Sequence, residues 1–356
     1  MLFVNRLSLF YIATVACFVM ACKPSEQDIN ALPVAVAGGE PGLYVIGGSF
    51  STAADTFATP ALWHGGGVLN LSTKKATSPR ITAQGRDVYI AGNNGNECVY
   101  WKNGSVIGTL YTPANTSSQV TGIALMGADV YVSGTMLTAG YYPLIPVYWK
   151  NGVLNYLPHP TVKGGNDDLF WHTTGIAISG SDIYISGDNY GEGVYWKNGN
   201  IIKLPNSEYA NGIIVSGTDV YVVGDMYGNP VTTTTYAGYW KNGVAVYMPN
   251  PSKISQKALA IAVKGNDIYV AGDISTGGGN TNAVYWKNGV LTTLSKTTGV
   301  GVRATGVCID PNNNLYISGT DAGPGQYTTL ATYWLNGSET VLSTKSSTAT
   351  GLVFVQ

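Results

Sequence analysis

Short runs in which apolar and polar residues alternate recur along the chain from residue 42 onward, and they predict β-strands. In one unit, residues 174–180 (TGIAISG) are separated by a turn from residues 182–187 (DIYISG). A variable loop follows, then VYWK, an Asn-Gly pair and a last apolar run. Asn-Gly between such runs is a strong hairpin signal, because both turn positions need positive φ. Each unit is therefore predicted to contain four antiparallel strands.

Two sequence words of this unit each occur seven times. The spacing between copies of the second-strand word is 37 to 53 residues, close to the length of one four-stranded propeller blade. Copies of this word begin at Gly42, Asp87, Asp129, Asp182, Asp219, Asp267 and Asn314. The word YWKNG and its variants centre on Trp63, Trp101, Trp149, Trp196, Trp240, Trp286 and Trp334.

The order of strands at the two ends of the repeat predicts a closed ring. The first unit starts at its second strand, residues 42–47, whereas the chain ends in TGLVFV, a first strand with nothing after it. Pairing these ends completes one blade and removes exposed edges, while an open solenoid would need polar caps that are not visible. We expect an all-β, seven-bladed β-propeller with four antiparallel strands per blade, closed by the C-terminal strand pairing in the first blade.

Several segments resemble known propeller families. LYVIGG at residues 43–48 resembles the second strand of kelch repeats, and DPNNNLY at residues 310–316 resembles the turn of NHL repeats. Over residues 42–356, the VYVAG-like and YWKNG words are similar to those of uncharacterised Bacteroidota lipoproteins built as propellers. This resemblance implies a fold and an envelope location, but no reaction.

The N-terminus has the pattern of an export signal. Residues 1–21 contain one charge, Arg6, followed by an apolar run, and are predicted to be a signal peptide. The sequence VMAC at residues 19–22 resembles a bacterial lipobox. This resemblance implies cleavage before Cys22 and attachment of lipid, including palmitate, to Cys22. The alternative is an ordinary cleaved signal peptide. Residues 22–41 would then be the lipidated Cys and a flexible tether. By the same resemblance, Lys23 in place of Asp implies the outer membrane, contacted through the N-terminal lipid only.

Composition excludes several partner classes. With 19 basic and 20 acidic residues, the chain lacks the positive surplus that nucleic-acid binding needs. No Cys spacing of the metal-binding type occurs, so we predict no cofactor and no metal. Cys98 and Cys308 fall in distant units, which makes a disulfide between them improbable. The propeller is expected to be a monomer.

The repeated residues have a structural explanation. The Tyr and Trp of each unit are predicted to fill the space between neighbouring blades, because blades diverge with distance from the axis. An Asp after the first turn and a Lys at the hairpin tip recur in five units and lie on one face. We expect turn chemistry from the Asp and solvated Lys side chains; a charged docking ring is the alternative.

The opposite face has the long loops, where function is usually placed. It combines aromatic residues that the repeat does not need with Asp residues that follow the second strands. Such groups suit a glycan, and suit a protein almost as well; packing among the loops is the alternative. The candidate ligand-binding residues are Tyr141, Tyr142, Trp171, His172, Asp188, Tyr190, Asp225, Tyr227 and Asp273.

No catalytic motif is recognisable, so we predict a non-catalytic binding or scaffold propeller in the cell envelope. The runner-up is a carbohydrate-active hydrolase or lyase that uses the three Asp residues or His159 and His172. A third possibility is a purely structural assembly module. His159, Asp167, Asp168 and His172 share the longest loop, but this spacing is nonspecific for metal binding.

Overall fold

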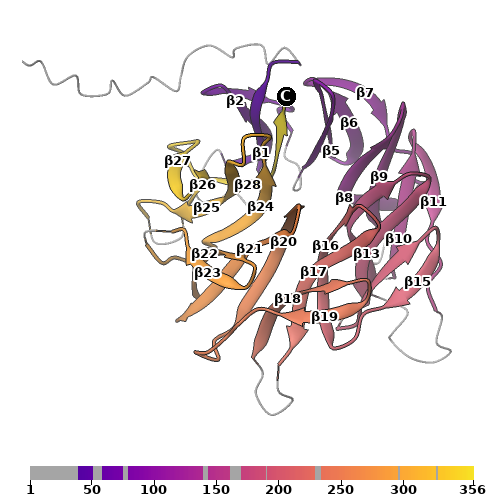
Figure 1. Cartoon of the computed structure of the whole chain (residues 1–356). Coiled ribbons are helices and arrows are strands. Elements are labelled where there is room, and N and C mark those ends of the chain that lie inside the picture. Colours follow the sequence, from indigo (N-terminus) through magenta and orange to yellow (C-terminus); the bar gives the residue numbers. More distant parts are fainter. Residues whose placement is uncertain are drawn as a thin grey trace, which may run out of the picture.

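The computed structural model describes residues 39–50, 58–74, 79–138, 143–160, 170–189, 191–228, 234–295, 297–325 and 328–356. These residues form seven sheets of four strands, arranged as a ring (Figure 1). All strand pairs within the sheets are antiparallel, and the described residues include no helix. The predicted all-β, seven-bladed β-propeller is confirmed.

Each sheet is one blade, and the blades are numbered from the N-terminal sheet. The strands of each blade are given from the axis of the ring outward. Blade 1 consists of β28 (Ser347–Val355), β1 (Gly42–Ser49), β2 (Thr59–His64) and β3 (Gly67–Asn70). Blade 2 consists of β4 (Arg80–Gln84), β5 (Asp87–Asn94), β6 (Glu97–Lys102) and β7 (Ser105–Thr109). Blade 3 consists of β8 (Thr116–Met126), β9 (Asp129–Thr138), β10 (Leu144–Lys150) and β11 (Val153–Tyr156). Blade 4 consists of β12 (Trp171–Ser179), β13 (Asp182–Asn189), β14 (Gly193–Lys197) and β15 (Asn200–Lys203).

The remaining blades follow the same order. Blade 5 consists of β16 (Ser207–Ser216), β17 (Asp219–Tyr227), β18 (Thr235–Lys241) and β19 (Val244–Tyr247). Blade 6 consists of β20 (Gln256–Lys264), β21 (Asp267–Gly277), β22 (Asn280–Lys287) and β23 (Val290–Thr293). Blade 7 consists of β24 (Arg303–Ile309), β25 (Leu315–Ala322), β26 (Thr329–Leu335) and β27 (Ser338–Val341).

The two ends of the repeat meet in blade 1. The last strand, β28, pairs antiparallel with β1, with Gly42 opposite Val355 and Ser49 opposite Ser347 (Figure 1). This pairing gives the first blade its innermost strand. The predicted closure of the ring by the C-terminal strand is confirmed.

The Asn-Gly hairpins connect the third and fourth strands of blades 2 to 7. Their Asn residues have φ between 49° and 52°, and the Gly residues that follow have φ between 81° and 87°. Two consecutive residues with positive φ form the type I′ turn, whose twist matches that of the flanking strands. The local sequence therefore determines these turns.

A hydrogen-bonded corner joins each of these hairpins to the first turn of the same blade. In blade 4, Asn198 Oδ1 accepts a hydrogen bond from Ile183 N at 2.9 Å, and Asn198 Nδ2 donates one to Asp182 Oδ1 at 2.8 Å. Lys197 Nζ lies 3.0 Å from Asp182 Oδ2 and 5.3 Å from the centre of the Tyr184 ring. Blades 2, 3, 5 and 6 contain the same arrangement. The Asp residues support turns as expected, but the Lys side chains are paired rather than only solvated.

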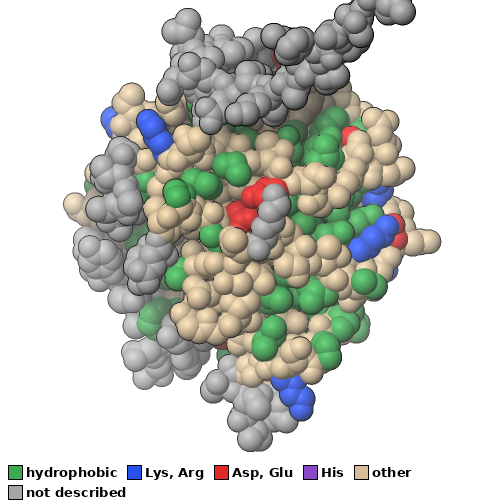
Figure 2. All heavy atoms as spheres, turned by 90° about the vertical axis from the view of Figure 1, so that its left-hand side faces the viewer, with side chains coloured by type: hydrophobic (Ala, Val, Ile, Leu, Met, Phe, Trp, Pro, Cys, Tyr) green, Lys and Arg blue, Asp and Glu red, His purple; other side chains and the backbone are tan. Residues whose placement is uncertain are grey.

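Seven hydrophobic clusters lie between neighbouring blades, one at each junction of the ring. The repeat Trp residues are at most 5% exposed and belong to these clusters or border them. In blades 3, 4 and 5 the indole Nε1 also donates to a backbone carbonyl of the preceding interblade loop, as from Trp196 to Pro158 at 2.7 Å. The repeated aromatic residues thus pack the blades together, as predicted. Charged side chains are sparse on the side of the ring shown in Figure 2.

The two cysteines within the described residues are unpaired. Cys98 lies in blade 2 and Cys308 in blade 7, and both are free thiols. Burial raises the pKa of each thiol to about 12. The expectation that the fold has no disulfide between them is confirmed.

The predicted signal peptide, Cys22 and most of the tether lie outside the described residues. Within the part of the chain that the structure describes, no helix has the length and apolar character needed to cross a membrane.

Candidate functional site

A cavity of about 740 Å³ occupies the mouth of the central channel on the long-loop face. Its wall consists mainly of the first strands of the blades, which begin at this face because the interblade loops lie there. The described lining includes nine threonines, together with Gln119, Asn211, His172, Arg80 and Arg303. The threonines are Thr121, Thr135, Thr173, Thr174, Thr305, Thr320, Thr329, Thr348 and Thr350.

Several of these polar groups connect neighbouring blades. Thr350 Oγ1 donates to Pro79 O at 2.9 Å, Thr305 Oγ1 donates to Ala349 O at 2.8 Å, and Arg80 Nε donates to Thr121 O at 2.9 Å. Each of these bonds crosses from one blade to the next. Hydrogen bonds therefore link the wall of the cavity across blades 7, 1, 2 and 3, and they help to hold the cavity in shape.

The other end of the channel is apolar. A separate cavity of about 380 Å³ is lined there by Ile123, Ile176 and Ile213 among others. A hydroxyl-rich ligand meets more polar side chains at the long-loop end, where the threonines lie, than at the other end, where Thr82 and Gln84 are the polar side chains of the lining.

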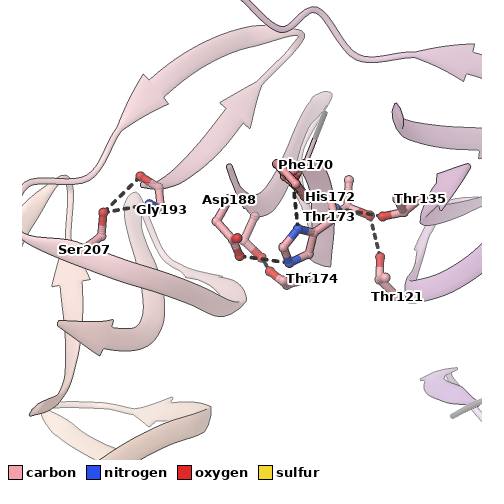
Figure 3. Close-up of polar contacts among 10 residues, drawn as sticks. Thr121, Thr135, Phe170, His172, Thr173, Thr174, Asp188, Gly193 and Ser207 are labelled. Carbon is pink, nitrogen blue, oxygen red and sulfur yellow. Dashed lines mark hydrogen bonds and ion pairs between the residues drawn. The ribbon is translucent and has the colours of Figure 1, made fainter. Parts of the chain in front are cut away.

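His172 lines the large cavity and has both ring nitrogens engaged (Figure 3). Nδ1 lies 3.2 Å from Phe170 O, and Nε2 lies 3.2 Å from Asp188 Oδ2. A backbone carbonyl only accepts, so Nδ1 must be the donor. Burial alone would lower the pKa of His172, but the hydrogen bond and charge of Asp188 raise it above the usual value. This geometry favours the protonated form of His172, which can donate from both ring nitrogens and pair with Asp188.

The three candidate Asp residues lie behind the wall of this cavity. Asp188, Asp225 and Asp273 are 1%, 2% and 4% exposed, and none of them is among its described lining. Burial raises the pKa of Asp225 to about 7, although Ala258 N donates to its Oδ1 at 3.1 Å. Burial also raises the pKa of Asp273, against the nearby charges of Arg303 and Lys257. The sequence predicted that these carboxyl groups would be accessible on the long-loop face, whereas the structure buries them.

The two candidate aromatic residues that the structure describes, Trp171 and Tyr227, are not among the lining of the cavity. Trp171 is 2% exposed and packs edge-on against Trp196, with ring centroids 6.1 Å apart, so it offers no stacking surface. Tyr227 is 50% exposed and donates from its hydroxyl to Gly191 O at 3.0 Å, beside a shallow peripheral cavity of about 470 Å³. Tyr141, Tyr142 and Tyr190 lie outside the described residues.

No group of three potential metal ligands occurs among the described residues. Asp167 and Asp168 of the loop considered for metal binding lie outside them. His159 is described, and its ring lies 6.0 Å from that of Trp171.

At one equivalent position of the first strand, the residue type differs from blade to blade. It lies opposite the residue that follows the second-strand Gly, as in the cross-strand pair of His172 with Asp188. The residues at this position, with their cross-strand partners, are Gln119 with Thr135, His172 with Asp188, Tyr209 with Asp225, Lys257 with Asp273, Arg303 with Thr320 and Thr348 with Gly48. Four of these six residues line the cavity.

Of the residues at this position, only His172 was predicted from the sequence as a candidate for ligand binding, because the candidates were sought in the loops and not in the first strands. The signal was present in the repeat itself: a position that varies within an otherwise repeated strand. Arg80 shows a second signal of this kind, since it replaces the Gly that five other blades have in the first strand, as at Gly175 and Gly306. At Gly306, an added Cβ would lie 3.2 Å from Gly351 Cα of the next blade.

No family model matches the chain, and no curated protein matches it. Among solved structures, an acylaminoacyl peptidase from Pyrococcus horikoshii is similar with a TM-score of 0.51 and 12% identity, over 85% of this chain and 50% of the peptidase. The extracellular domain of a hybrid two-component system from B. thetaiotaomicron aligns with a TM-score of 0.41 and 10% identity, over 86% of this chain and 39% of that protein.

A GH43 endo-arabinanase from Bacillus licheniformis aligns with a TM-score of 0.32 and 11% identity, over 66% of this chain and 94% of the arabinanase. The chain thus spans half or less of the first two proteins. At these identities the similarity to the peptidase concerns the fold alone, and the fold is a β-propeller.

Proposed function

We propose that this protein is a non-catalytic binding propeller whose ligand, a glycan or a protein segment, enters the channel mouth on the long-loop face. The observation that supports this most is the cavity of about 740 Å³, which falls within the size range of ligand sites. Its wall presents hydroxyl, amide and guanidinium groups, all of which form hydrogen bonds with sugars or peptides. The interblade hydrogen bonds preorganise that wall, which lowers the entropic cost of binding.

Blocking the cavity tests this proposal. Gln119 is exposed in β8 at the channel mouth, so a Gln119→Trp substitution places a bulky indole in the cavity and obstructs a ligand there. Gln84 is exposed in β4 at the apolar end of the channel, and Gln84→Trp is the matched control. We expect glycan-array and pull-down signals of the full chain, purified in mild detergent, to disappear with Gln119→Trp and to persist with Gln84→Trp. Equal binding by both variants would refute this location.

We also propose that the propeller is exported and anchored through lipid on Cys22, in the outer membrane. The support is the sequence of residues 1–22 alone, with its apolar run and lipobox-like end. An intact mass of the purified mature protein is expected to show diacylglycerol and acyl chains on an N-terminal Cys22. An unmodified mature N-terminus would remove this proposal.

A carbohydrate-active hydrolase or lyase is the second candidate. The observation that favours it is the pKa of Asp225, about 7, which suits a general acid or base near neutral pH. Against it, Asp225 is 2% exposed and lies behind the cavity wall, so a substrate does not reach it in this conformation. Turnover of a bound sugar that disappears with Asp225→Asn would favour the hydrolase.

A further inference from the structure

The cavity at the channel mouth has an unusual concentration of arginine for this chain. The sequence contains four arginines, and two of them, Arg80 and Arg303, line the cavity. No Asp or Glu is among its described lining. The charged groups that face a ligand at the described wall are therefore basic, although the whole chain has a net charge of −1.

Arg303 differs from the other basic residues at the variable first-strand position. His172 lies opposite Asp188 and Lys257 lies opposite Asp273, so each faces a carboxyl group across its strand pair. Arg303 lies opposite Thr320, which is neutral. Among the described residues, Arg303 has no ion-pair partner within 4 Å. Its charge lowers the pKa of Asp273 in the neighbouring blade, but that carboxyl group is only 4% exposed.

Arg80 has a different role from Arg303. Its guanidinium group donates through Nε to Thr121 O and through Nη1 to Pro79 O at 3.3 Å, so it is part of the wall. A guanidinium group has five N–H donors in a planar fork, which matches the two oxygens of a carboxylate. Arg303 is the basic side chain of the wall that retains this capacity for a ligand.

The neighbours of Arg303 suit a hydroxylated ligand better than an apolar one. Within the described wall, the side chains of Gln119 and Thr348 line the cavity with no hydrogen bond to other described residues. Gln119 and Thr348 occupy the same first-strand position as Arg303 in their own blades. Their amide and hydroxyl groups therefore lie at the same level of the channel as the arginine.

We propose that the channel mouth binds a carboxylated sugar of the uronate type, with the carboxylate paired to Arg303 and sugar hydroxyls bonded to Gln119 and Thr348. This proposal rests on the binding function above and specifies its ligand class. An acidic peptide would also offer a carboxylate. The wall favours the sugar, because Gln119 and Thr348 offer an amide and a hydroxyl group beside Arg303, and Leu137 and Leu144 add small apolar surfaces rather than a deep apolar pocket.

The test compares charged and neutral sugars of the same configuration on the full chain in mild detergent. Galacturonate and galactose, and glucuronate and glucose, are titrated by calorimetry or by saturation-transfer NMR at low and high salt. We expect each uronate to bind at least tenfold more tightly than its neutral counterpart, and the difference to shrink at high salt. Arg303→Gln is expected to remove this preference.

The matched control is Arg86→Gln, which removes the same charge from an exposed turn residue outside the cavity. Unchanged uronate preference in Arg86→Gln, with loss in Arg303→Gln, supports the proposal. Equal binding of uronates and neutral sugars, or equal behaviour of the two variants, overturns it while leaving a neutral-glycan propeller intact. Selective binding of an acidic peptide overturns the sugar assignment alone. Binding of none of these probes, together with no signal in the array and pull-down, overturns the binding function as well.

Discussion

Among single residues, Asp225 is a carboxyl group that the fold removes almost completely from water. It is 2% exposed, and its pKa is raised to about 7 by burial, with a contribution from the charge of Asp273. The hydrogen bond from Ala258 N at 3.1 Å offsets part of this effect. Because the unfolded chain has the ordinary Asp pKa, the native state binds an extra proton between about pH 4 and 7.

The stability of the protein is therefore predicted to fall as pH rises through this window. A folded pKa above the unfolded value makes the free energy of unfolding decrease with pH, and the decrease ends above the folded pKa. Between pH 5 and pH 8, we expect Asp225 to contribute a loss of about 3 kcal/mol, from roughly two pKa units at 1.36 kcal/mol each. Asp225→Asn keeps an acceptor for Ala258 N but does not titrate, so it is expected to lose this contribution.

Urea unfolding of the wild type and the variant at both pH values measures the effect. The control is Asp182→Asn, since the pKa of Asp182 is lowered by Asn198 and Lys197, and its contribution is complete before pH 5. An equal pH dependence in Asp225→Asn and the wild type would contradict the assignment.

At the scale of elements, the Asn-Gly hairpin is the unit on which each blade depends. The Asn combines three functions: it adopts positive φ, it accepts from the backbone of the second strand, and it donates to the Asp of the first turn. In blade 7 the pattern continues with Asn314 in place of Asp, where Asn336 Nδ2 donates to Asn314 Oδ1 at 3.0 Å. The amide geometry is thus retained where the ion pair is absent.

We predict that the amide of this corner stabilises the blade more than its ion pair does. In blade 3, Asn151→Ala removes two hydrogen bonds and places a Cβ-bearing residue without local support at φ 50°, and should cost about 2 kcal/mol. Lys150→Gln removes an exposed ion pair and the contact of Lys150 with the Tyr131 ring, and should change stability far less. Chemical unfolding of both variants decides between them. A larger effect of Lys150→Gln would show that the charges dominate.

At the scale of the whole molecule, stability depends on closure of the ring. Strand β28 completes blade 1, and hydrogen bonds from Thr305 to Ala349 O and from Thr350 to Pro79 O join that blade to both neighbours. The hydrophobic clusters on either side of blade 1 include Ala349 and Val355 of the same strand. Removing β28 exposes the edge of β1 and opens two interblade cores.

Deletion of residues 347–356 is therefore predicted to abolish cooperative melting and to cause association through the exposed strand edge. Thermal unfolding and size-exclusion chromatography measure both effects. A synthetic peptide of residues 347–356, added in trans, is expected to restore a cooperative transition and the monomeric elution volume, whereas a scrambled peptide is not. Cooperative, monomeric behaviour of the deletion variant without peptide would show that closure is dispensable.

The sequence alone determined the architecture of this protein. Strand alternation, Asn-Gly turns and recurrent Trp residues are local signals repeated seven times, and the incomplete units at the two ends implied the closure now seen between β1 and β28. These signals are readable because each strand, turn and interblade contact is formed again from the same residues at every repeat.

Only the tertiary structure decided where the candidate site lies. Arg80, His172 and Arg303 belong to blades 2, 4 and 7, and ring closure alone brings them to one cavity. Trp171 and Asp225 were expected at the surface of the long-loop face, but the structure buries both in the packed interior. The physical reason is that exposure, and the convergence of distant side chains, depend on how seven blades pack around an axis. A repeat specifies the blade, whereas the ring geometry determines which non-repeated side chains face the channel.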